Sequence, residues 1–175
     1  RNTKLFQIAI IFIVGFIVYL SAFGNTFIGD NELFIKTWEG ARHLSNIPNL
    51  FLGNDFNAIR FRPVGSTFLT IYYQFFGQEP LGYIITSLLW HIASGVMIYL
   101  IVDRLVGSRL WVVGSTRSER TTNCLPLIAA LIFVVHPVNT EAVLTIFSNI
   151  TFAYFLYFAA FYFHITKRYV FASVL

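Results

Sequence analysis

Residues 136–141 place several polar side chains inside a strongly apolar stretch of the chain. The segment reads His-Pro-Val-Asn-Thr-Glu and supplies an imidazole, an amide, a hydroxyl and a carboxylic acid. An ionised group at the centre of a lipid-exposed helix costs roughly 2.5–3.5 kcal/mol, and Pro137 removes a backbone donor as well. We therefore expect the segment to face protein or a water-filled cavity, where its side chains could meet a substrate.

Pro137 limits how this stretch can cross a bilayer. Residues 125–136 would form roughly 18 Å of helix at about 1.5 Å per residue, which is short of a hydrocarbon core of about 30 Å. Either the helix continues past a kink, or it ends early and the polar segment enters the membrane as a partly unwound turn. Both alternatives place Asn139, Thr140 and Glu141 near the outer leaflet.

The composition is typical of a polytopic membrane protein. Hydrophobic residues make up 57% of the chain, charged residues 11%, and the mean hydropathy is +0.69, which excludes an ordinary soluble domain. Four stretches approach the roughly 20 residues that one span needs. They are residues 5–23, 81–102, 125–146 and 147–165. We predict an all-α fold in which residues 1–175 form one transmembrane domain.

A fifth apolar stretch, residues 63–76, is too short to cross a membrane. Its apolar residues recur at helical spacing and its polar residues fill the other side. The apolar side carries Val64, Phe68, Ile71, Tyr72 and Phe75, and the polar side carries Ser66, Thr67, Thr70, Tyr73 and Gln74. With Pro63 suited to the first turn, we expect an amphipathic helix along the membrane surface.

The cations indicate the orientation. Eight of the twelve Lys and Arg residues lie in short segments that fall on one side if the chain crosses four times. These are Arg1, Lys4, Arg104, Arg109, Arg117, Arg120, Lys167 and Arg168. The positive-inside rule makes this side cytoplasmic, with both ends and residues 103–123, and leaves the loop 24–80 outside. The net charge of +4 is thus a topology signal and does not indicate a nucleic-acid partner.

Several motifs together resemble the N-terminal part of a GT-C glycosyltransferase. They are Phe27-Ile28-Gly29-Asp30-Asn31, Arg62-Pro63-Val64, Pro80-Leu81-Gly82-Tyr83, His91, and His136-Pro137-Val138-Asn139-Thr140-Glu141-Ala142-Val143. The likeness is closest to the protein O-mannosyltransferase-like branch that often carries tetratricopeptide repeats, and it covers most of the chain. It implies an integral protein of a prokaryotic plasma membrane.

The resemblance also implies a reaction. Such enzymes move a sugar from a polyprenyl-phosphate carrier to an acceptor at the outer membrane face, and an acid in the first outer loop acts on the acceptor. That acid would be Asp30. Arg60 and Arg62 lie where the lipid phosphate would lie, and guanidinium groups suit that role.

Residues His136, Asn139 and Glu141 are the other candidate substrate-binding residues. His136 and Glu141 also have a structural interpretation: the imidazole could satisfy the carbonyl freed by Pro137, and the acid could cap a helix N-terminus. We expect His91 to be a neutral, hydrogen-bonded helix residue. No close group of His, Asp or Glu has the spacing of metal ligands, and no cofactor is expected.

Departures from the family pattern leave a second function open. Asn31 follows Asp30 where such enzymes usually have two adjacent acids, and residues 149–152 lack the usual arginine and acid. The chain also holds only the N-terminal part of such an enzyme. The alternative is a catalytically silent structural or assembly subunit, with other membrane subunits as partners in a larger complex.

The charge pattern predicts the sidedness of two loops. In a Cys124→Ser background, single cysteines at Asn54 and Ser115 should react with a membrane-impermeant thiol reagent from opposite sides of the membrane. Labelling of both positions from one side would contradict the four-span arrangement.

Overall fold

The structure is a computed structural model that describes residues 2–27, 35, 37, 39–53, 62–112, 124–144 and 149–168. Every regular element in these residues is helical, which confirms the all-α fold class. The α-helices are α1 (Asn2–Val18), α3 (Ile47–Leu52), α4 (Pro63–Phe76), α5 (Pro80–Val112), α6 (Leu125–Val135), α7 (Thr140–Leu144) and α8 (Asn149–Ile165). Short 3-10 turns are η1 (Leu20–Gly24), η2 (Glu39–Arg42), η3 (Leu44–Asn46) and η5 (Pro137–Asn139).

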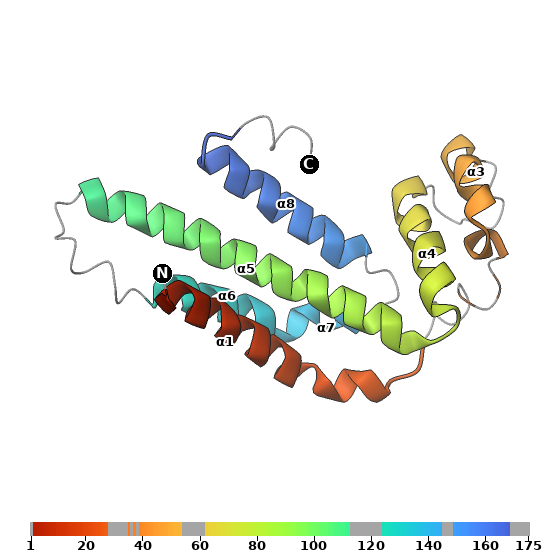
Figure 1. The fold of residues 1–175 in the computed structure, drawn as a ribbon, viewed down its shortest axis with the longest axis horizontal. Coiled ribbons are helices and arrows are strands. Elements are labelled where there is room, and N and C mark those ends of the chain that lie inside the picture. Colours follow the sequence, from red (N-terminus) through yellow and green to blue (C-terminus); the bar gives the residue numbers. More distant parts are fainter. Residues whose placement is uncertain are drawn as a thin grey trace.

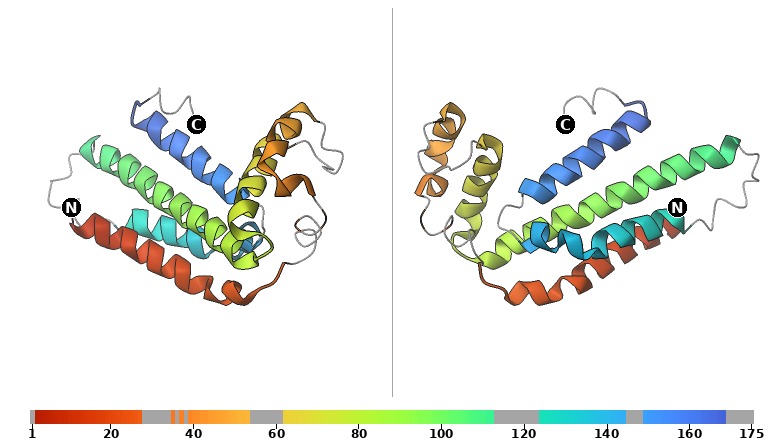
Figure 2. Two further views of the ribbon diagram at one scale, coloured as in Figure 1. Left: turned by 45° about the vertical axis from the view of Figure 1, so that its right-hand side comes forward. Right: turned by 180° about the vertical axis from the view of Figure 1, so that it is seen from behind.

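Four helical segments lie side by side and alternate in direction (Figure 1). The long helix α5 is central, with α8 on one side and α1 and α6 on the other (Figures 1 and 2). The start of α1, the end of α5, the start of α6 and the end of α8 lie at one end of the molecule. Helices α3 and α4 lie at the opposite end, beside the start of α5.

The helices differ in how well they fit a bilayer. Within the described residues, one helix, Pro80–Val106 of α5, is long and apolar enough to cross a membrane alone. The pair α6 and α7 passes the same test only together and is bent by 48° at the break between them. Helices α1 and α8 are apolar but have 17 residues each, about 25 Å at about 1.5 Å per residue. The structure thus supports one candidate span, and the other predicted spans stay predictions.

The main core joins α1, α5 and α6. Its buried residues are Ile11, Tyr19, Leu88, Ile92, Tyr99, Ala130, Val134 and Val143. Two glycines allow the close contact: a Cβ atom on Gly15 would lie 2.7 Å from Cγ1 of Ile92, and one on Gly95 would overlap Val134. Small residues at helix contacts are the usual means of close packing between apolar helices, because lipid gives no hydrophobic drive for their association.

A second core connects α3 and α4 to the start of α5. It is formed by Ile35, Leu50, Leu69 and Tyr83. The hydroxyl of Tyr83 donates to the carbonyl oxygen of Gly77 at 2.8 Å. Gly77 itself ends α4 with φ 55° and ψ −121°, a conformation that side chains disfavour. This tight connection fixes α4 across the end of the bundle.

Helix α4 has the bounds that the sequence pattern predicts, and it packs residues of both its expected faces against other elements. Phe68 of the expected apolar side packs on Phe152 of α8, with ring centroids 4.7 Å apart. Thr70, which the pattern puts on the polar side, is fully buried. Its hydroxyl donates to the carbonyl oxygen of Ser66 at 3.0 Å, so burial leaves it satisfied. The expected polar face is wrong at Thr70: α3 and η2 pack against α4, and Gln74, one turn after Thr70, donates to the carbonyl oxygen of Arg42 in η2 at 2.9 Å.

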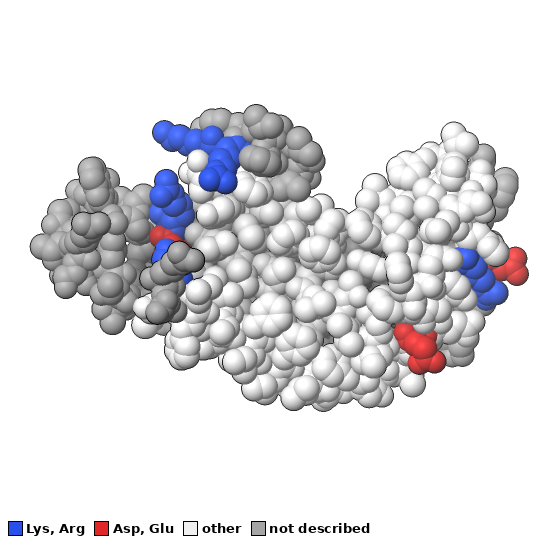
Figure 3. Space-filling view, in the orientation of Figure 1, with Lys and Arg blue, Asp and Glu red and all other residues white. Residues whose placement is uncertain are grey.

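The described charged side chains lie toward the two ends of the molecule, and a band without charge separates them on the face that Figure 3 shows. The end at which α1 starts and α5 and α8 end (Figure 1) holds Lys4, Asp103, Arg104, Lys167 and Arg168. Around α4, the preceding 3-10 turns and the start of α5 (Figure 1), the described charged side chains are Glu39, Arg42, Arg62 and Glu79, and Glu141 is on α7. Lys4 and Asp103 form an ion pair at 2.6 Å between α1 and α5. Among the side chains that the structure describes, the first end therefore carries four cations against one acid.

The close contact at Gly95 predicts a test of the packing. Gly95→Ala should lower the free energy of unfolding by about 1–3 kcal/mol, because the added methyl group overlaps Val134. Chemical unfolding in detergent micelles measures this. Gly24→Ala is the matched control, since a Cβ atom there meets nothing within 4 Å. Equal stability of the two variants would contradict the packing.

Candidate functional site

The helix α6 ends at Val135 and the chain then unwinds at the polar segment. His136 is extended, with φ −67° and ψ 126°. The 3-10 turn η5 follows, and α7 begins at Thr140. Of the two alternatives that Pro137 leaves open, the structure shows the helix that ends early and the partly unwound turn.

The break frees the carbonyl oxygen of Phe133. In a continuous helix this oxygen would accept a hydrogen bond from the backbone nitrogen four residues later, which belongs to Pro137 and has no hydrogen. The side-chain amide of Asn139 fills the gap: its Nδ2 donates to the Phe133 oxygen at 2.8 Å. Asn139 therefore folds back and closes the turn that Pro137 opens.

The break also frees the carbonyl oxygen of Val134. The amide of Val138 would be its partner in a helix, but that N–H donates to Nδ1 of His136 at 3.2 Å. Nε2 of His91, on α5, lies 3.1 Å from the Val134 oxygen instead. Because a carbonyl oxygen can only accept, this contact requires the hydrogen on Nε2 of His91. A side chain from another helix thus completes the turn.

His91 is enclosed in the main core. It is 1% exposed and lies between the rings of Tyr19 and Phe133, at centroid distances of 5.7 and 5.0 Å. Tyr19 directly follows α1, so its ring brings the first helical segment into contact with His91. His91 is hydrogen-bonded inside its helix bundle, as the sequence predicts. Sequence reasoning misses the contact between Tyr19 and His91, because no local pattern connects the end of α1 with the middle of α5.

The candidate residues of the polar segment have different positions. His136 and Glu141 are exposed, and Asn139 is half-buried. Glu141 lies in the first turn of α7, where a carboxylate is favoured near the positive end of the helix dipole. One interpretation had the His136 imidazole satisfy the carbonyl freed by Pro137. In the structure Asn139 does this, and Nδ1 of His136 accepts a hydrogen bond from the backbone N–H of Val138.

Two of the candidate residues, Asp30 and Arg60, lie outside the residues that the structure describes. We expect Asp30 and the polar segment 136–141 to meet across one outward-facing cavity with Arg60 or Arg62 at its rim, and this stays a prediction. Arg62 is described, is exposed and directly precedes α4.

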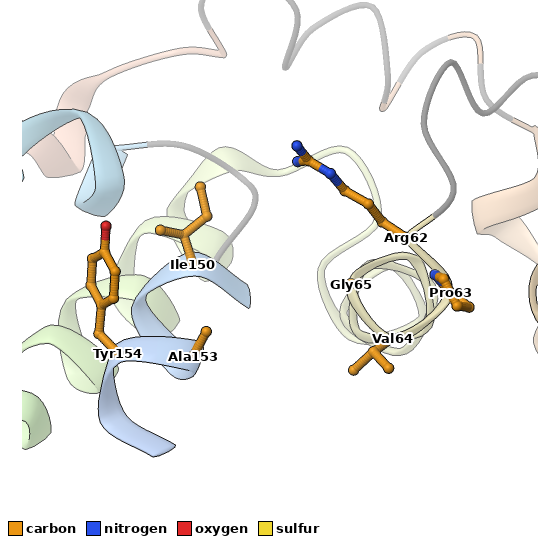
Figure 4. A pocket seen from close by; sticks show the side chains of 7 residues that line it. All are labelled: Arg62, Pro63, Val64, Gly65, Ile150, Ala153 and Tyr154. Atoms are coloured by element: carbon orange, nitrogen blue, oxygen red, sulfur yellow. The ribbon is translucent and has the colours of Figure 1, made fainter. Parts of the chain in front are cut away.

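Arg62 lines an open hollow of about 520 Å³ between the start of α4 and the start of α8. The lining residues are Arg62, Pro63, Val64, Gly65, Ile150, Ala153 and Tyr154. The Arg62 guanidinium and the Tyr154 hydroxyl come from opposite walls and point toward the same side of the hollow (Figure 4). Apolar side chains fill the walls between them. No residue of the polar segment 136–141 is part of this lining.

The hollow and the polar turn contain no metal centre: across the described ranges, no group of three or more His, Cys, Asp and Glu side chains could hold a metal ion. None of the known protein families, characterised proteins or solved structures matches the chain. The function proposed for this chain therefore rests on its own residues and on the motifs quoted above.

The two freed carbonyl oxygens predict a stability effect. Asn139→Leu should lower the free energy of unfolding by about 1–3 kcal/mol, because it leaves the Phe133 oxygen unsatisfied. His91→Leu should lower the free energy of unfolding in the same way, because it leaves the Val134 oxygen unsatisfied. His91→Gln keeps an N–H donor and should lower the free energy of unfolding less than His91→Leu does. Unfolding in detergent micelles measures these differences.

Asn49→Ala is the control for the asparagine change. Asn49 is exposed, and its Nδ2 donates to the side-chain oxygen of the neighbouring Asn46 at 2.9 Å. Its loss should change stability by less than about 0.5 kcal/mol. An effect of Asn139→Leu as small as this would show that the turn does not need the amide.

Proposed function

We propose that the chain is the N-terminal part of a membrane glycosyltransferase that takes a sugar from a polyprenyl-phosphate carrier and passes it to an acceptor at the outer membrane face. The observation that carries this proposal is the hollow between α4 and α8, which joins one cation, Arg62, to apolar walls. A lipid phosphate has the matching chemistry, an anionic head on a hydrocarbon chain.

Each wall of the hollow has a part in this proposal. The guanidinium of Arg62 pairs with the phosphate, and the Tyr154 hydroxyl can donate to a phosphate oxygen. Val64, Ile150 and Ala153 offer an apolar surface to the first units of the lipid chain. Arg60, close by in the sequence, would add a second cation.

The proposed membrane placement follows from the arrangement of helices and charges. We place four crossings along α1, α5, the broken pair α6 and α7, and α8, because these segments alternate in direction. The end with α3 and α4 lies outside and the end with four cations lies in the cytoplasm. On α4, Val64 and Phe75 are 60% and 77% exposed, which suits a helix whose apolar side enters the interface.

The acid and the polar turn have separate roles in the proposed reaction. Asp30 removes the proton of the acceptor as a general base, a contribution of roughly 10²–10⁴ in rate. His136 and Glu141 are exposed where they can bind sugar or acceptor, and Asn139 holds the turn that presents them.

The exposed apolar faces of α1 and α6 favour a second candidate function, a catalytically silent subunit of a larger membrane complex. Phe6 and Ile13 on α1 and Ile132 on α6 are 67%, 58% and 58% exposed. Lipid or further helices cover these faces in the enzyme, whereas neighbouring chains cover them in the subunit. The two functions differ in whether Asp30 matters for sugar transfer.

The proposed enzyme predicts that donor binding and transfer can be separated. In vesicles with a polyprenyl-phosphate sugar, Arg62→Gln should weaken donor binding about tenfold, since a charge-assisted hydrogen bond contributes about 1.5 kcal/mol. Tyr154→Phe should weaken it less. Asp30→Asn should abolish transfer and leave donor binding unchanged. Binding is measured by titration of a labelled donor, and transfer by product analysis.

Tyr157→Phe is the matched control for the hollow. Tyr157 is on the same helix as Tyr154, is 70% exposed and is not part of the lining, so its change should leave binding intact. Donor binding that survives Arg62→Gln would remove the hollow as the phosphate site. Transfer that survives Asp30→Asn would remove Asp30 as the base and favour the silent subunit.

A further inference from the structure

The helix α8 ends in a conformation that would suit glycine, yet the residue there is a lysine. The amide of Lys167 donates to the carbonyl oxygen of His164 at 3.0 Å, and that of Arg168 donates to Phe163 at 2.9 Å. This pair of bonds is the Schellman arrangement, whose left-handed residue is usually glycine. Lys167 has φ 61°, and it is the only non-glycine residue with positive φ in the described part of the chain.

The fold thus accepts backbone strain at a place where it presents two adjacent cations. Strained backbone persists where a function or the surrounding structure requires it. Lys167 and Arg168 are both exposed, and neither is packed into a core. The strained turn therefore contributes a charge at the surface and no buried contact that would explain it.

These two cations follow the end of α8, at the same end of the molecule as the start of α1, which carries Lys4, and the last part of α5, which carries Arg104 (Figure 1). We call Lys4, Arg104, Lys167 and Arg168 the basic collar. Asp103 is the one acid at this end among the described side chains, and its carboxylate is paired with Lys4. The collar keeps an excess of positive charge next to the uncharged band of the bundle.

We propose that the basic collar binds anionic phospholipid headgroups of the leaflet on its side of the membrane. The collar borders the apolar band, which is the level at which headgroups surround an embedded bundle. Long Lys and Arg side chains can keep their stems along apolar surface and extend their charges to the headgroups. The left-handed turn at Lys167 places two such side chains in succession just past the end of α8.

The same four cations could instead stabilise helix ends or set the orientation of insertion, but neither of these roles would make the chain prefer one lipid headgroup over another. Cations near a helix end favour its dipole, and cations in short loops fix the orientation of insertion. Neither role needs a lysine at the left-handed position, where glycine would cost less. The inference does not depend on sugar transfer, because a silent subunit with this structure would bind the same headgroups.

The proposal is tested by comparing how strongly the chain associates with an anionic and with a zwitterionic phospholipid. The full chain is reconstituted in phosphatidylcholine vesicles with spin-labelled phosphatidylglycerol or phosphatidylcholine, and the fraction of motionally restricted lipid gives their relative association constants. The natural chain should prefer phosphatidylglycerol. Each cation that is removed should lower this preference about fivefold, because the attraction of one Lys or Arg to an anionic surface is worth about 1 kcal/mol. Added salt should lower it as well.

Lys167→Gly is the decisive variant, because glycine fits the left-handed turn and removes the charge without disturbing the fold. Lys167→Arg should keep the preference. Arg42→Gln is the control for the loss of any cation. Because Arg42 lies at the opposite end, its removal should leave the preference for phosphatidylglycerol at the collar unchanged. Unfolding in phosphatidylcholine confirms that Lys167→Gly is folded. Equal association of both lipids with the natural chain, or an unchanged preference in Lys167→Gly, would overturn the proposal.

Discussion

A buried backbone carbonyl without a hydrogen-bond donor is costly, and Pro137 creates this situation at the end of the apolar helix α6. The structure meets the constraint twice, with Asn139 on the Phe133 oxygen and His91 on the Val134 oxygen. Through these bonds an unwound turn can persist beside apolar helices. The exposed side chains that follow it are placed by this turn.

The helix packing serves the same constraint. His91 can reach Val134 only if α5 and α6 approach closely, and Gly95 permits this because a side chain there would overlap Val134 itself. Tyr19, directly after α1, adds a third segment, with its ring against His91. Close packing and hydrogen bonding are therefore coupled at the break, and a change in one disturbs the other.

The two ends of the molecule have contrasting chemistry. The end with α4 combines a hollow lined by Arg62 with the exposed polar turn, an arrangement that suits a phosphorylated lipid and an acceptor. The other end carries the basic collar beyond the apolar band. An embedded chain with these ends would meet a reactive lipid on one side and bulk anionic lipid on the other, with the rigid core between them.

The sequence by itself determines the features that depend on local chemistry. Composition gives the helical, apolar class, Pro63 and Gly77 bound α4, and the missing N–H of Pro137 marks the break. Only the tertiary structure decides which groups complete that break. His91 lies 43 residues from Val134, and Thr70 is buried in a helix against which α3 and η2 pack. The physical reason is that contacts between distant helices depend on how closely their backbones approach, which no local periodicity records.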